Sequence, residues 1–225
     1  MNIHDMHVTF RTIAQQMGMH LYRAILPESI DTFINNEIHE LTQNIINSNV
    51  SEPYKDKITH QDNKISPVNA LRTLVKNRSI GNNAVYFPNE NKFVMRVSKS
   101  LLQNPMYYSS FSIIVGNKVN ACRFVENDRV SVLLRDYCNA PTIQEPIIVL
   151  ADEDTSNIHL DIYVGGNKSF DSLNITYLKN PEVVNFNNSV DCDLPEHLHH
   201  KIVELAVTKY VQSVNLSAQT IKEQK

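Results

Sequence analysis

The feature that most constrains this chain is a short apolar run followed by a well-bounded helical pattern near its C-terminal end. From Leu173 to Leu178 apolar and polar residues alternate, which is the period of a strand with one buried face. Pro181 ends this run. The helical pattern begins with Asp193 as the expected N-cap and Glu196 three residues later, a capping box that satisfies free backbone donors. The sequence therefore predicts a strand followed closely by a capped helix.

Apolar residues behind that cap recur at helical spacing and form a stripe wide enough to pack against two neighbours. The stripe consists of Leu198, Ile202, Val203, Leu205, Ala206, Val207, Tyr210 and Val214. An exposed stripe of this width would promote aggregation. We therefore expect the C-terminal helix, about 20 residues or roughly 30 Å long, to pack back onto helices near the N-terminus.

Two amphipathic helices are predicted in the N-terminal part. The first runs from about His4 to His20, and the second starts near Pro27 and carries an apolar stripe through residues 30–45. Their short connection indicates an antiparallel αα-hairpin. The polar segment 47–64 is interpreted as an exposed loop, and a short third helix is expected over residues 66–75.

The middle of the chain has the pattern of strands joined by turns. Gly116-Asn117 between two β-branched runs is a hairpin signal. Strands are expected at 84–87, 93–97, 107–115, 119–125, 147–151, 158–164 and 173–178, with a short helix after Asn127. Helices followed by strands indicate an α+β fold. We divide the chain into a helical part (1–80), an antiparallel β-rich part (81–192) and a C-terminal helix (193–225) that completes the helical part.

Composition excludes several classes of protein. The formal net charge of −3 offers no basic surface for gripping nucleic acid. No run approaches the roughly 18 apolar residues that span a bilayer, and the first residues lack the pattern of a secretion signal. Cys122, Cys138 and Cys192 are odd in number and widely separated, which indicates free thiols in a reducing compartment.

The richest group of possible metal ligands is Glu196, His197, His199, His200 and Glu204. Three of them, at positions 196, 200 and 204, fall on one helix face. The order is not His-Glu-x-x-His, and histidines in a first helical turn lie at the positive end of the helix dipole. We interpret the group as a solvated face or subunit contact in which Glu204 pairs with His200, and keep a metal site as the alternative.

Tyr107, Tyr108 and Phe111 are the residues singled out as a possible aromatic interface. Aromatic residues in a strand are more often part of the core. We therefore keep two interpretations, an exposed interface and a place in the core. Both alternatives place the three residues on the strand expected at 107–115.

Three smaller groups have ordinary interpretations. His7 is expected to be a structural or surface residue of the first helix, and the acidic run 152–154 to be a solvated turn. Arg72, Lys76 and Arg78 form a basic spot at the end of the third predicted helix, where cations suit the dipole. A DNA contact at this spot is the alternative.

Nothing in the sequence resembles a catalytic set. There is no glycine-rich phosphate loop, no Gly-x-Ser-x-Gly turn and no supported Cys–His pair. Catalysis needs polar groups of matched roles in one pocket. We therefore expect a structural or interaction protein with no catalytic residues, cofactor or metal.

Both ends of the chain carry a resemblance to a known family. The segments are Phe10–Gly18, Ile30–Glu37, Thr176–Pro181 and Asp191–Ala206. They resemble the head-to-tail connector (ring, adaptor or neck) proteins of crAss-like podoviruses and related tailed bacteriophages, in which an Ile-Asp-x-x-Leu-Asn-like segment lies on an early helix. Here isoleucine stands at the leucine position. The middle of the chain matches only by its general strand pattern.

The resemblance implies a non-enzymatic structural protein of the virion, located at the head–tail junction and made in the cytoplasm of the bacterial host. Copies would assemble into a ring, twelvefold to match the portal, and bind the portal protein and other neck or tail proteins. The ring would extend the DNA channel, touch packaged double-stranded DNA transiently and involve no membrane. Alternatives are another tail, baseplate or cargo-associated virion protein, a nucleic-acid binder, or a metal-dependent enzyme using His197, His199 and His200.

Overall fold

The computed structural model describes residues 1–18, 25–50 and 71–223 of the 225-residue chain. The chain forms two compact units. The helical unit comprises Met1–Leu74 and Pro181–Lys225, and the β unit comprises Val75–Asn180. These borders differ from the predicted parts, because residues 75–80 belong to the β unit and residues 181–192 to the helical unit.

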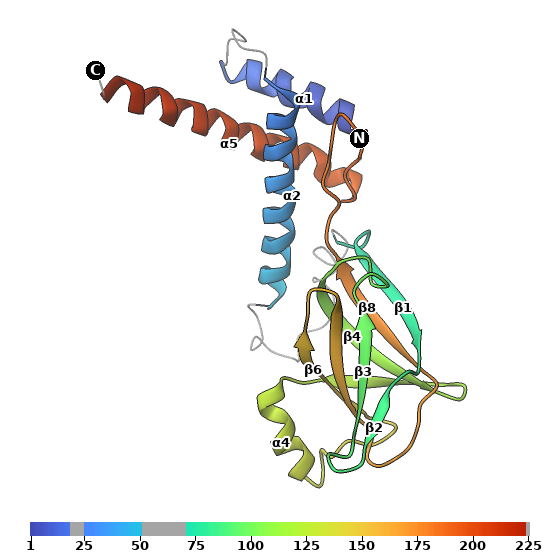
Figure 1. Ribbon diagram of the computed structural model, residues 1–225. Helices are drawn as coiled ribbons and strands as arrows, with labels where there is room; N and C mark the ends of the chain where they lie inside the picture. Colours follow the sequence, from blue (N-terminus) through green and yellow to red (C-terminus); the bar gives the residue numbers. More distant parts are fainter. Residues whose placement is uncertain (19–24, 51–70, 224–225) are drawn as a thin grey trace, which may run out of the picture. The chain divides into compact units, whose positions relative to one another are not determined.

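The helical unit contains α1 (Ile3–Gln16), α2 (Pro27–Val50) and α5 (Glu196–Glu223). α5 packs against both α1 and α2, as Figure 1 shows, while α1 and α2 touch each other less. The ring of Tyr210 on α5 lies 5.7 Å from that of Phe10 on α1 and 5.4 Å from that of Phe33 on α2. The expected return of the C-terminal helix onto the N-terminal helices is thus confirmed.

The start of α5 differs from the prediction. The helix begins at Glu196, three residues after the expected cap Asp193, whose carboxylate accepts a hydrogen bond from the backbone N–H of Glu182. The preceding residues are held by other contacts: Asp191 accepts from the backbone N–H of Ile3 at 2.7 Å, and Leu194 is buried. These tertiary contacts keep residues 191–194 out of the helix, an effect that local capping rules do not include.

The β unit is one eight-stranded sheet with a short helix. Its elements are β1 (Val75–Gly81), β2 (Val85–Phe87), β3 (Lys92–Ser98), β4 (Pro105–Val115), β5 (Lys118–Phe124), α4 (Asn127–Arg135), β6 (Ile147–Glu153), β7 (Asn157–Tyr163) and β8 (Ser172–Lys179). The strand order is β1-β8-β4-β5-β6-β7-β3-β2. The α+β class is confirmed.

The sheet is mixed rather than purely antiparallel. β5 and β6 are parallel, and every other neighbouring pair among the described strands is antiparallel. The chain crosses from β5 to β6 through α4. A crossover of this kind is what parallel neighbours require, whereas a tight turn can join only antiparallel ones.

The sequence predicts a third helix over residues 66–75, directly before β1, and no strand over residues 76–81. Residues 71–74 instead form a turn, and β1 pairs with β8 from Val75 opposite Leu178 to Gly81 opposite Ser172. The start of the expected helix and residues 51–64 of the expected loop lie outside the described residues. β1 is mostly exposed, so it lacks the apolar alternation by which a half-buried strand is recognised.

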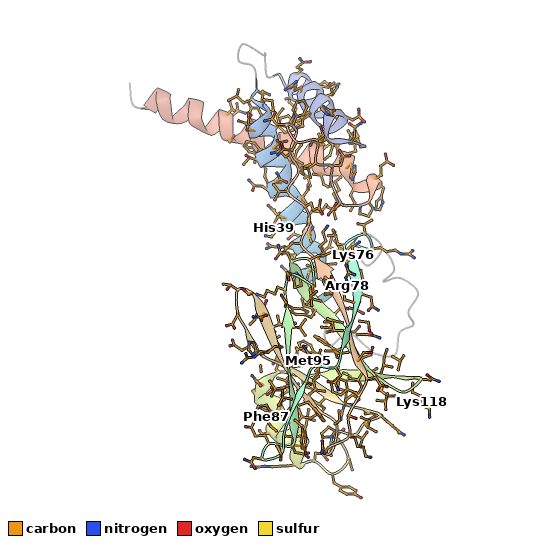
Figure 2. The ribbon with its side chains drawn as sticks, turned by 45° about the vertical axis from the view of Figure 1, so that its right-hand side comes forward. His39, Lys76, Arg78, Phe87, Met95 and Lys118 are labelled. Atoms are coloured by element: carbon orange, nitrogen blue, oxygen red, sulfur yellow. The ribbon has the colours of Figure 1, made fainter. Side chains whose placement is uncertain are left out.

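Strands from both ends of the sheet order contribute to one core. The core includes Phe93, Met95, Val97, Phe111, Ile113, Ile148, Ile158, Leu160, Ile162, Leu173, Ile175 and Tyr177. Met95 is labelled within the β unit in Figure 2. Because β3 and β8 lie far apart in the order yet share this core, the sheet curls around its apolar face.

Gly165 supports a close approach of two loops in the β unit. Its φ is +72°, and a Cβ at this position would overlap the carbonyl oxygen of Pro141.

We expect Gly165→Ala to lower the free energy of unfolding of the β unit by about 2 kcal/mol or more, from backbone strain plus the overlap. Gly116→Ala is the control, because Gly116 also has positive φ (+59°) but open space around it. Equal losses in urea unfolding would contradict the role of Pro141.

Candidate functional site

Two polar side chains of α2 hold the backbone of residues 184–187, where the chain enters a turn. The side chain of Asn35 donates to the carbonyl oxygen of Val184 at 3.0 Å and accepts from the N–H of the same residue at 2.8 Å. Asp31 accepts from the backbone N–H of Phe186 at 3.0 Å. We call these two side chains and the backbone they hold the clamp. It is the best-defined polar site in the helical unit.

The helical spacing of the clamp residues explains why they act together. Asp31 and Asn35 are four residues apart and therefore lie on one face of α2. Glu28, three residues earlier, extends this row and accepts a hydrogen bond from the side chain of Asn187 at 3.2 Å. An Asn side chain carries the same donor and acceptor groups as a peptide unit. The face of α2 thus holds the backbone of residues 184–187 at the point where the chain turns.

His7 of α1 connects the first helix to the clamp. Its Nε2 lies 2.7 Å from Oδ1 of Asp31, and its ring stacks on that of Phe186 at 4.5 Å. The side chain is 1% exposed, and its Nδ1 has no partner among the described residues. Burial lowers the pKa of His7 below its ordinary value, although Asp31 opposes the shift. The clamp therefore joins three separate pieces of chain.

The lowered pKa of His7 predicts a pH dependence of stability. The unfolded chain binds more protons at this position than the folded chain once the pH falls below about 6.5. We expect the free energy of unfolding to be retained above that pH and to fall as the pH drops through the folded-state pKa. The measurement is urea unfolding at a series of pH values.

A histidine variant isolates this contribution. His7→Gln should show a smaller loss of stability between pH 7.5 and pH 5.5 than the unaltered chain, and His197→Gln, at an exposed position, serves as the control. An identical pH slope in the His7→Gln variant and the unaltered chain would contradict the assignment to His7.

The C-terminal histidine group is divided among different contacts. The predicted pair of His200 and Glu204 is confirmed, with 3.2 Å between Nδ1 and Oε1 on an exposed face. Glu196, the third residue of that face, instead binds the N-terminal ammonium of Met1 at 2.6 Å. Among the residues that the structure describes, no three His, Cys, Asp or Glu side chains converge as metal ligands.

His199 lies inside the helical unit rather than on its surface. It is 5% exposed, with Nδ1 3.0 Å from the carbonyl oxygen of Met1 and Nε2 2.8 Å from that of Leu194. Each ring nitrogen therefore lies within hydrogen-bond distance of a backbone carbonyl oxygen, and the residue fastens the start of α5 to the beginning of the chain.

The three aromatic residues proposed as an interface differ in how far their side chains are buried. Tyr107 is 48% exposed, whereas Tyr108 and Phe111 are 9% and 2% exposed and belong to the core. A register shift between Tyr108 and Ser110 interrupts the pairing of β4 with β8. The hydroxyl of Tyr108 is buried and has no hydrogen-bond partner in the part of the chain that the structure describes, and burial raises its pKa. Of these three residues, Tyr107 alone is exposed on the surface of the β unit.

The basic residues and the acidic run singled out from the sequence are exposed surface residues. Lys76 and Arg78 are exposed on β1 (Figure 2) rather than at a helix end, and Arg72 belongs to the preceding turn. In the acidic run, Glu153 pairs with Lys99 at 2.9 Å, and Asp154 lies 3.3 Å from His159. The three cysteines are free, as the sequence predicts.

Sequence reasoning missed the clamp as a site. The signal was present in the polar pair Asp31 and Asn35, which interrupts the apolar pattern of α2 at i and i+4 and belongs to the segment that carries the family resemblance. Its partner could not be identified, because Val184 lies 149 residues from Asn35 in the sequence.

Among the described helices, none has a stretch long and apolar enough to cross a lipid bilayer. No protein-family model matches the chain, and no curated protein is detectably similar to it in sequence.

Proposed function

We propose that this protein is a head-to-tail connector component of a tailed bacteriophage, a non-enzymatic virion protein that forms a ring and binds the portal. In this proposal the ring lies at the head–tail junction, extends the DNA channel and contacts neighbouring neck or tail proteins. Twelve copies would match the symmetry of a portal. The slightly acidic chain suits a channel in which DNA slides rather than sticks.

The proposal rests on the position of the four segments that resemble the connector family. Three of the four, residues 10–18, 30–37 and 191–206, belong to the helical unit. Within it, Asp31 and Asn35 of the Ile-Asp-x-x-Ile-Asn segment are the two clamp residues. The resemblance therefore covers residues that build one structural unit, including the polar pair that holds it together.

The helical unit also offers a surface for contact between copies. A groove of about 630 Å³ between α1 and α5 is lined by ten residues, among them the exposed apolar Val8, Met17 and Leu205. A head-to-tail contact that uses this groove and a different surface of the next copy would close into a ring if the rotation permits. We propose this groove as one of the two surfaces that meet in the ring.

Native mass spectrometry of the full chain, alone and mixed with the portal protein, tests the proposal. We expect a closed ring of about twelve copies, either alone or on the portal. Leu205→Glu should abolish the ring, since it places a charge in the groove, while circular dichroism stays unchanged. Val119→Glu, at a similarly apolar and exposed position in the β unit, is the control.

A strict monomer or dimer that ignores the portal would overturn the proposal. Co-assembly with other tail proteins, but not with the portal, would instead favour a tail, baseplate or cargo-associated virion protein. A second mixture, of the full chain with the other neck or tail proteins, is measured in the same way and distinguishes the two assignments.

A further inference from the structure

The outer edge of β1 is a seven-residue strand edge with no neighbour among the described strands. β1 is the last strand at one end of the sheet and pairs with β8 along its whole length. Its opposite side therefore presents backbone N–H and C=O groups that pair with no strand in the described ranges. Edges of this kind accept a further strand by backbone hydrogen bonding.

Two cations mark this edge. Lys76 and Arg78 are exposed, and neither has an ion-pair partner among the described residues. They lie opposite Tyr177 and Ile175 of β8. Since directly opposite residues of an antiparallel pair point to the same side of a sheet, Lys76, Arg78 and Ile80 share one face of β1. A strand added beside β1 would place alternate side chains next to these three.

A groove runs beside the second half of this strand. Its volume is about 460 Å³, and its lining residues are Arg78, Ser79, Ile80, Gly81, Ser100, Leu101 and Gln103. Leu101 is 58% exposed and supplies an apolar contact on the wall opposite β1. The edge is therefore bordered by a surface that a bound strand could also touch.

The wall of the groove formed by residues 99–104 is firmly anchored. The N–H of Lys99 donates to the carbonyl of Ser156 at 2.9 Å, and the carbonyl of Asn104 accepts from the N–H of Asn180 at 3.1 Å. Gln103 and Asn104 both adopt positive φ, +50° and +57°. Consecutive non-glycine residues in this region cost energy and persist only where their surroundings fix them. The wall is thus held in a defined shape.

A second copy of this chain is a poor occupant of the edge. Antiparallel pairing of β1 with β1 of another copy would bring the cations at positions 76 and 78 of both copies together, and like charges across a strand pair are unfavourable. The other edge strand, β2, is only three residues long and consists of Val85, Tyr86 and Phe87. It offers no acidic side chain to the cations.

We propose that the edge of β1 binds an extended segment of a different protein that carries acidic side chains at alternate positions. In antiparallel orientation, an apolar side chain of the segment lies beside Ile80 and Leu101, and two acidic side chains lie beside Arg78 and Lys76. The proposal stands on the β unit alone and does not depend on the ring function, so either can fail without the other.

The test is an NMR titration of the isotope-labelled full chain with a blocked synthetic peptide, Thr-Val-Thr-Glu-Thr-Glu-Thr. We expect saturable changes at the amides of β1 and of residues 99–104. A peptide with lysine in place of glutamate should bind about tenfold more weakly. A peptide N-methylated at the alternate residues whose N–H groups face β1 should not bind, because it cannot donate hydrogen bonds to the carbonyl groups of that strand.

Charge reversal provides the decisive variant. Lys76→Glu with Arg78→Glu should invert the preference, so that the lysine peptide binds better than the glutamate peptide, while the rest of the spectrum is kept. Lys118→Glu changes a cation at the tip of the β4–β5 hairpin (Figure 2) and should leave the preference unchanged.

Three results would overturn the proposal. The first is no saturable binding of the glutamate peptide, and the second is binding that maps to other residues. The third is a double-stranded DNA oligonucleotide that shifts the amides of Lys76 and Arg78 when the peptide does not. That last outcome would assign the cations to phosphate contacts instead.

Discussion

Replacing Asp31 by alanine should lower the free energy of unfolding of the helical unit by about 3 kcal/mol. The change removes the acceptor for the backbone N–H of Phe186 and the partner of His7 at once. Both groups then remain inside the unit without a hydrogen bond, and each such group costs about 1–3 kcal/mol. Loss of a buried charged partner adds to this cost.

A graded series separates the clamp from a general effect of substitution. Asp31→Asn keeps one acceptor oxygen and should cost less than Asp31→Ala. Asn35→Ala loses both bonds to Val184 and should cost about 2 kcal/mol. Glu204→Gln removes only the exposed pair with His200 and should change stability by about 0.5 kcal/mol or less.

The measurement is urea unfolding followed by the helical circular dichroism signal, together with amide hydrogen exchange along α2 and at residues 184–187. Faster exchange should be confined to the helical unit, because the β unit has its own core. If Asp31→Ala were no more harmful than Glu204→Gln, the clamp would have no role in stability.

Tyr177 of β8 should respond in opposite directions to two substitutions. It is fully buried in the core, and its hydroxyl has no partner among the described residues. Tyr177→Ala removes a large buried side chain and should cost the β unit about 3–5 kcal/mol. Tyr177→Phe removes only the unpaired hydroxyl and should raise the free energy of unfolding by about 1 kcal/mol.

Tyr86 provides the matched control for the phenylalanine substitution. Its hydroxyl donates to Oδ1 of Asn91 at 2.8 Å at a partly exposed position. Tyr86→Phe loses this bond and should therefore lower stability by about 0.5–1 kcal/mol. Denaturant unfolding of the three variants gives the signs directly. A loss of stability in Tyr177→Phe would show that its hydroxyl is bonded in solution, most simply to a buried water.

Elements with a strong apolar period could be predicted from the sequence. The stripe on α5 and the alternation in β8 gave the right element types, because their faces are buried against one core each. β1 could not be predicted, since an exposed strand is held by its backbone bonds to β8 rather than by apolar side chains. The same reason applies to the parallel pairing of β5 and β6, because periodicity carries no information about partners.

The candidate site was less predictable than the fold. Asp31 and Asn35 are visible as polar residues on one helix face, but their partners are backbone groups far away in the chain. His199 was grouped with its neighbours as a surface residue, and the structure instead buries it between two carbonyl groups. Local patterns report periodicity and caps, whereas these side chains are placed by contacts that form only when both ends of the chain meet.

The two units are not consecutive in the sequence, because the β unit is inserted between α2 and α5. Val75 at its entry lies directly opposite Leu178 near its exit, so the inserted unit begins and ends at adjacent points. During synthesis the β unit can fold as soon as residue 180 has left the ribosome, while α1 and α2 must wait for α5, their main packing partner. The order of translation thus makes the helical unit, which contains the first residues of the chain, the last to be completed.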